Sequence, residues 1–243
     1  RETEQRVTAL LTDEIQIAQF IPPHLRQRVE KSANLRITPV DSIEIMFLAM
    51  QPKPPFDKKE VRQALDLAID KKAIVDAVTF GQGTIANSYI PKGALYYYAD
   101  NLQRPYDPEK AKKLLTDAGV SNLTLNYLIR AGDEVDEQTA VLVQQQLAKA
   151  GITANLQKVD PSQEWDMLVA SDYDVGVNYW TNDILDPDQK TTFVLGHDAN
   201  MNYMTRYNNE TVKALVAAAR VEMDPPKREQ MYVDLQKTAK EDV

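Results

Sequence analysis

Residues 123–159, LTLNYLIRAGDEVDEQTAVLVQQQLAKAGITANLQKV, decide the fold class of this 243-residue chain. Apolar and polar residues alternate over 123–129 and again over 152–159, which is the period of a half-buried strand. Between these runs, 137–150 carries the apolar spacing of a helix, and Gly151 stands where a helix commonly ends. The order of strand, helix and strand is typical of an α/β domain.

The segments that follow continue this alternation. Ser162 is expected to cap a helix that runs to residue 170, and 173–179 (YDVGVNY) alternates as a strand. Two more helices are predicted within 209–239, separated by the Asp-Pro-Pro sequence at 224–226. We therefore expect a mixed, partly parallel sheet flanked by helices.

The residues before 123 add helices and one long apolar run. Helices are predicted with N-terminal caps at Asp57, Asp70 and Asp107. The alternation over 14–18 predicts a short strand. The run IEIMFLAM at 43–50 is long enough for a buried strand and too short to span a membrane.

Composition and charge exclude several classes of protein. The chain has 36 acidic and 28 basic residues, and its net charge of −8 argues against nonspecific binding to nucleic acid or to an anionic membrane. It has no Cys, and therefore no disulfide, thiol nucleophile or cysteine metal site. Its two His residues leave little for a metal site or a Ser-His-Asp triad. We therefore expect a binding protein without cofactor or metal, and no enzyme.

The segment 180–188, WTNDILDPD, is the strongest candidate for a binding site. It follows a predicted strand, and loops after the carboxyl ends of strands in open α/β sheets are where ligands usually bind. A carboxylate beside an aromatic wall suits the ammonium group of a ligand. The same pattern is also typical of a turn in which Asp183 and Asp186 cap backbone amides and Trp180 lies in the core.

Two further interpretations of this segment involve its acids. A calcium site on Asp183, Asp186 and Asp188 would lack the Gly and the terminal Glu of an EF-hand loop. An enzyme could use Asp183 and Asp186 as an acid–base pair on a glycoside. The other acidic groups, the run at 133–137 and the pair that flanks Trp165, are interpreted as solvated helix starts, where acids suit the helix dipole.

Several motifs resemble those of a known family. PPFD at 54–57 is followed by VRQAL at 61–65, and YDPEKAKKLL at 106–115 is followed by AG at 118–119. Together with the segment 180–187, these motifs resemble the family 5 extracellular solute-binding proteins, which are the oligopeptide- and dipeptide-binding components of ABC importers. The resemblance covers most of the chain.

The resemblance implies a two-lobed protein that closes around its ligand by a hinge and delivers it to an ABC permease in the membrane. Because such proteins are normally much longer, residues 1–48 are expected to be the end of the first lobe with the hinge strand. Residues 49–243 are then the second lobe, truncated before its return strand. The chain begins at Arg1 without a Met or a signal-like segment, which fits such a piece. The implied protein is a monomer in the periplasm or outside the cell, soluble or lipid-anchored.

The resemblance also carries a ligand-binding role for this loop. In peptide-binding members the acid three residues after the Trp receives the α-ammonium group of the peptide, and here that acid is Asp183. Further residues are expected to line the peptide or to hydrogen-bond it as an added strand: Trp180, Tyr179, Thr181, Phe47 and Asn200. Short peptides are the leading ligand class, with a nickel chelate, a sugar, heme or glutathione as alternatives.

Overall fold

The computed structural model describes residues 3–40, 42–181, 183–196 and 202–243. The chain divides into two compact units. The smaller unit comprises Arg1–Ser42 with Val75–Thr84, and the larger one comprises Ile43–Ile74 with Ile85–Val243. Helix α4 (Lys71–Thr79) begins in the larger unit and ends in the smaller one.

The smaller unit begins with two short helices, α1 (Thr3–Leu11) and α2 (Pro23–Glu30). Its core is formed by buried apolar residues from both helices: Val7, Leu10, Leu25 and Val29. The strand predicted over 14–18 is wrong. The backbone amides of Glu14 and Ile15 both donate to the carbonyl of Ala9, so they close the end of α1 and are not available to a ladder.

The larger unit carries the sheet and the remaining helices. Its strands are β1 (Ile45–Met50), β2 (Thr124–Arg130), β3 (Thr153–Val159) and β4 (Val175–Trp180). Its helices besides α4 are α3 (Lys59–Ala68), α5 (Pro108–Asp117), α6 (Glu134–Lys149), α7 (Pro161–Ala170), α8 (Asp188–Leu195), α9 (Glu210–Val221) and α10 (Pro225–Glu241).

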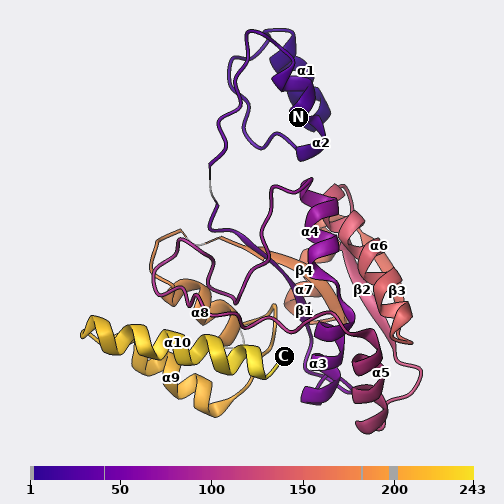
Figure 1. Ribbon diagram of the computed structural model, residues 1–243, viewed down its shortest axis with the longest axis vertical. Helices are drawn as coiled ribbons and strands as arrows, with labels where there is room; N and C mark the ends of the chain where they lie inside the picture. Colours follow the sequence, from indigo (N-terminus) through magenta and orange to yellow (C-terminus); the bar gives the residue numbers. More distant parts are fainter. Residues whose placement is uncertain (1–2, 41, 182, 197–201) are drawn as a thin grey trace. The chain divides into compact units, whose positions relative to one another are not determined.

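The strands of the described residues form one sheet in the order β1-β4-β2-β3. β2 is parallel to both β3 and β4, and β1 is antiparallel to β4, which confirms the predicted mixed sheet. The chain crosses from β2 to β3 through α6 and returns to β4 through α7. Because crossovers are right-handed, opposite directions of travel place these two helices on opposite faces (Figure 1).

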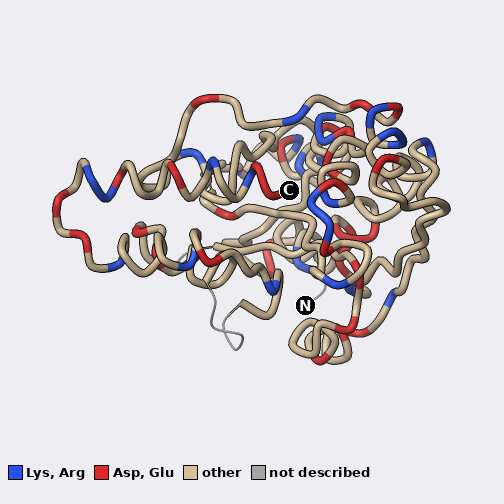
Figure 2. Tube along the Cα trace, turned by 90° about the horizontal axis from the view of Figure 1, so that it is seen from below, with Lys and Arg blue, Asp and Glu red and all other residues tan. Residues whose placement is uncertain are grey.

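Helices α8, α9 and α10 pack together beside the sheet (Figure 1). Their shared core includes Val194, Val216, Tyr232 and Leu235, all of them buried. Figure 2 shows acidic and basic residues interleaved along α9 and α10, which differs from the continuous basic face that nucleic acid binding requires. This layer supports the loop that follows β4.

The predicted helix caps are confirmed at two positions and wrong at two. Asp70 accepts from the amide of Ala73 at 3.0 Å, and Asp107 caps α5 by accepting from the amide of Lys110. The N-cap of α3 is Lys58, one residue after Asp57, because the Pro-rich turn extends that far. The N-cap of α7 is Asp160, which leaves Ser162 inside the first turn. Helix α8 was not predicted at all.

Candidate ligand-binding site

The segment 180–187 leaves the sheet at the carboxyl end of β4 and leads directly into α8. β2 and β3 end at the same edge, since they run parallel to β4 and to each other. β1 begins there, because Ile45 pairs with Trp180. Ligands of open α/β sheets bind outside this edge. The loop therefore lies where the topology places a binding site.

Asp183 is exposed, and a neutral side chain holds its carboxylate. Gln189 donates from Nε2 to Oδ2 of Asp183 at 2.6 Å and accepts, through Oε1, from the backbone amide of Asp183 at 2.9 Å. Because the Gln189 amide carries no charge, the carboxylate is oriented without being neutralised. An oriented and exposed carboxylate suits a charge-assisted hydrogen bond from a ligand ammonium group.

Asp186, three residues later, is held differently. Nη1 and Nη2 of Arg228 donate to its two carboxylate oxygens at 2.6 and 3.0 Å, and these hydrogen bonds lower the pKa of Asp186. A general acid requires a raised pKa, so the geometry does not support an acid–base pair of Asp183 with Asp186. Asp188 lies 3.4 Å from Arg220. Two of the three acids that a calcium site would require therefore face guanidinium groups.

The other residues expected to contact the ligand occupy two faces of the sheet. The Trp180 ring packs on Phe193 of α8, with ring centroids 4.2 Å apart. Phe47 lies on the same face of the sheet as Trp180 and packs against apolar core residues. Tyr179 points to the opposite face and is 44% exposed. Thr181 is exposed just beyond the strand, and Asn200 lies outside the described residues.

Arg130 is a site residue that the sequence interpretation missed. It is the last residue of β2, and its Nη1 donates to the hydroxyl of Tyr179 at 3.0 Å. Its Nε lies 3.8 Å from Oε2 of Glu164, at the start of α7. The signal was present in the sequence: a cation at the carboxyl end of a predicted parallel strand lies at the ligand-binding edge.

Two acids interpreted as solvated helix starts are largely buried instead. Asp136 is 5% exposed and accepts from the backbone amide of Arg130 at 2.8 Å, and burial raises its pKa to about 7. Burial also raises the pKa of Glu164. Asp133 does cap α6, accepting from the amides of Val135 and Asp136. Asp136 thus contacts the backbone of Arg130, and Glu164 lies beside its guanidinium group, because α6 and α7 both begin at this edge of the sheet.

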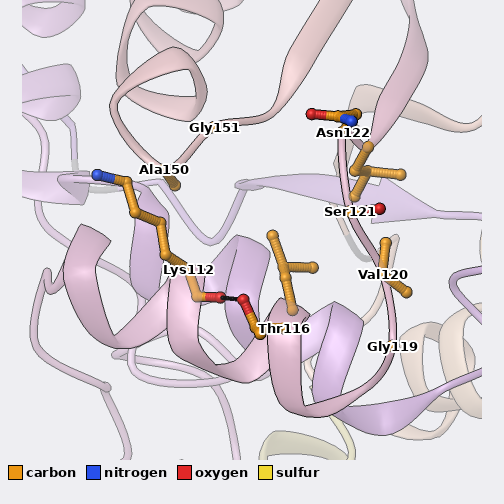
Figure 3. A pocket seen from close by; sticks show the side chains of 10 residues that line it. Lys112, Thr116, Gly119, Val120, Ser121, Asn122, Ala150 and Gly151 are labelled. Carbon is orange, nitrogen blue, oxygen red and sulfur yellow. Dashed lines mark hydrogen bonds between the residues drawn. The ribbon is translucent and has the colours of Figure 1, made fainter.

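A hollow of about 470 Å³ lies at the opposite end of the strands, and Figure 3 shows the side chains that line it. It is bordered by the ends of α5 and α6 and by the chain entering β2. Lys112 is the only charged residue among those that line it. The hollow therefore offers no carboxylate to an ammonium group, and the edge that carries Asp183 remains the candidate site.

Comparison with known proteins agrees with this fold. Residues 1–202 match the family described as bacterial extracellular solute-binding proteins, family 5 Middle. The chain belongs to this family of substrate-binding transport proteins, whose members are periplasmic or extracellular. Among the described residues, no helix is long and apolar enough to cross a membrane.

Individual relatives bind different ligands. The chain is 32% identical over 249 residues to di/tripeptide-binding protein 3 of Pseudomonas aeruginosa, covering 98% of this chain and 46% of that protein. It is 34% identical over 203 residues to heme-binding protein A of Haemophilus influenzae, covering 80% and 37%. The crystal structure of a dipeptide-binding protein from Pseudoalteromonas in complex with Met-Leu shares the fold, with a TM-score of 0.90, 24% identity and coverage of 99% and 49%. The chain spans about half the length of the curated relatives it matches.

Proposed function

We propose that this chain forms part of the substrate-binding component of an ABC importer for short peptides, and that Asp183 receives the α-ammonium group of the ligand. The observation that carries the proposal is the state of this carboxylate. Asp183 is exposed at the carboxyl edge of the sheet, three residues after Trp180, whose ring packs on Phe193, and a neutral amide holds it. The loop thus offers one oriented negative charge and, three residues earlier, an aromatic ring.

Arg130 supports the proposal because it supplies the opposite charge. β2 and β4 are neighbours, and the contact of Arg130 with the Tyr179 hydroxyl brings its guanidinium to the strand that leads to Asp183. A short peptide is a zwitterion with an ammonium group at one end and a carboxylate at the other. Arg130 is placed to attract that carboxylate, and guanidinium groups bind carboxylates with good geometry.

The proposal extends to the whole protein. Residues 1–48 belong to the first lobe with its hinge strand and 49–243 to the second lobe, and the two lobes close around the peptide. The closed receptor then delivers its ligand to a membrane permease. Its place of action is the periplasm or the outside of the cell, and it acts as a monomer.

Isothermal titration calorimetry on the full-length protein tests the proposed role of Asp183. We expect Asp183→Asn to weaken binding of the dipeptide Met-Leu by about 2–4 kcal/mol, because a desolvated ammonium group loses its charge partner. Asp172→Asn, an exposed acid in the turn before β4, is the matched control and should leave the affinity unchanged. Equal affinities for Asp183→Asn and the unaltered protein would overturn the assignment.

The same titration separates peptide binding from the alternative ligands. Heme has no ammonium group, so preferred binding of heme should be insensitive to Asp183→Asn. Glutathione also carries an ammonium group, on its γ-glutamyl residue, so the affinities of the unaltered protein for glutathione and for Met-Leu separate these two ligands. A protein that binds heme and no dipeptide would contradict the proposed ligand class while leaving the family unchanged.

A further inference from the structure

Helix α8 supports the proposed ligand-binding segment at three points. Gln189 binds Asp183, Nζ of Lys190 lies 3.5 Å from the carbonyl oxygen of Trp180, and the ring of Phe193 packs on the ring of Trp180. All three side chains come from one helix of eight residues. Trp180 and Asp183 are therefore both held by the helix that follows them in the chain.

The contact between Gln189 and Asp183 is the most specific of the three. One amide group uses its donor and its acceptor on a single residue, six positions earlier in the chain. Rotating the Asp183 side chain would break one bond, and moving its backbone would break the other. Gln189 is itself half-buried, whereas Asp183 is exposed. The less mobile side chain thus restrains the more exposed one.

We infer that Gln189 is a positioning residue, which orients Asp183 before a ligand arrives and leaves Oδ1 to accept from the ligand ammonium group. The inference rests on the proposed function, since it assumes that Asp183 binds the ligand amine. Without the Gln189 bonds, an exposed Asp side chain would lose rotamer freedom only on binding, and that ordering would weaken the affinity.

The absence of charge on Gln189 matters as much as its two hydrogen bonds to Asp183. A cation at this position would form an ion pair with Asp183, as Arg228 does with Asp186, and would compete with the ligand ammonium group. A carboxylate would repel Asp183. An amide holds the carboxylate and keeps its charge. Gln189 therefore favours ligands with a free amine over acylated ones.

Two peptides and four variants of the full-length protein test this inference. The peptides are Met-Leu and N-acetyl-Met-Leu, and the variants are Gln189→Ala, Gln189→Glu, Asp183→Asn and Gln230→Ala. Gln230 provides the matched control, because its Nε2 also donates to an exposed Asp, Asp234, at 2.8 Å, but within α10. Thermal unfolding of each variant verifies that it is folded.

We expect Gln189→Ala to weaken Met-Leu binding roughly tenfold, which corresponds to the cost of ordering one side chain on binding. Binding of N-acetyl-Met-Leu should change by less than about twofold, because that ligand offers no ammonium group. Gln189→Glu should lose more affinity for Met-Leu at about pH 7.5 than at about pH 5.5, since the introduced carboxyl group repels Asp183 until it takes up a proton. Gln230→Ala should bind both peptides as the unaltered protein does.

The outcomes distinguish the inference from the proposed function. If Asp183→Asn weakens Met-Leu binding and Gln189→Ala does not, Gln189 has no positioning role and the inference is wrong. If Gln189→Ala weakens both peptides equally, its effect is a general loss of structure, which also overturns the inference. If Asp183→Asn changes neither peptide, the proposed function fails, and the inference fails with it.

Discussion

The two halves of the loop between β4 and α8 use the same residue type in opposite ways. In the first half, Asp183 is exposed and bonded to a neutral Gln. In the second half, Asp186 is bonded through both oxygens to Arg228, whose guanidinium also lies over the rings of Tyr96 and Tyr232. In the proposed function the first acid binds the amine of a ligand, whereas the second attaches the loop to α10.

This contrast separates the acid that is proposed to bind a ligand from an acid with a structural partner. The sequence places the two carboxylates three positions apart, and neither spacing nor residue type separates them. Their partners do. A guanidinium neutralises the carboxylate and lowers its pKa, whereas an amide fixes its direction only. The functional assignment therefore depends on the neighbours that α8 and α10 bring to the loop.

Removing Arg228 should have the largest effect on stability. Arg228→Ala leaves the half-buried Asp186 without its cation and removes the cation–π contacts with Tyr96 and Tyr232. We expect the free energy of unfolding to fall by about 2–3 kcal/mol in urea titrations. Arg220→Ala, which removes the more exposed pair with Asp188, should cost less than about 1 kcal/mol. Equal losses in the two variants would contradict the structural role assigned to the second half of the loop.

Replacing Lys190 tests the cost of burying a charge next to the first half of the loop. Lys190 is 1% exposed, and burial lowers its pKa to about 8, partly opposed by Glu44. The folded protein therefore loses this proton at a pH where the unfolded chain, with a lysine pKa of about 10.4, keeps it. The free energy of unfolding should accordingly rise with pH between about 8 and 10.4, and the gain should disappear as pH falls through 8.

Lys190→Met should remove that slope and raise the free energy of unfolding at neutral pH by about 1–2 kcal/mol, because no charge is buried. Urea titrations at a series of pH values measure both effects. Lys227→Met, at an exposed lysine that pairs with Asp224, is the control and should leave the slope in place. The idea fails if Lys190→Met retains the slope of the unaltered protein.

The sheet and most helices could be predicted because their apolar residues repeat with a clear period. Within 123–179, the strands β2, β3 and β4 follow the alternation of apolar and polar residues, and the helices between them lie where this alternation is interrupted. The strand predicted over 14–18 has the same alternation, but backbone bonds to the end of α1 leave it without a partner strand. The period of the apolar residues indicates which side chains are buried. Whether a β-ladder forms depends on a partner strand that lies beside the segment in space.

The support of the site could not be predicted in the same way. Helix α8 begins at Asp188, within a segment that is interpreted from the sequence as a loop rich in acids. Its sequence DQKTTFVL shows no clear apolar stripe. Its side chains hold the loop through Gln189, Lys190 and Phe193, which are contacts across a turn that sequence spacing does not reveal. Arg130 and Asp136 meet for a similar reason, because β2 ends where α6 begins.

A crystal structure of the full-length protein with Met-Leu tests the central claim most directly. The account predicts the α-ammonium nitrogen of Met-Leu within hydrogen-bond distance, about 2.7–3.0 Å, of Asp183 Oδ1, with the Gln189 contact to Oδ2 retained. The ligand carboxylate should lie toward Arg130. An ammonium group bound to a different acid, with Asp183 still exposed to water, would contradict the account.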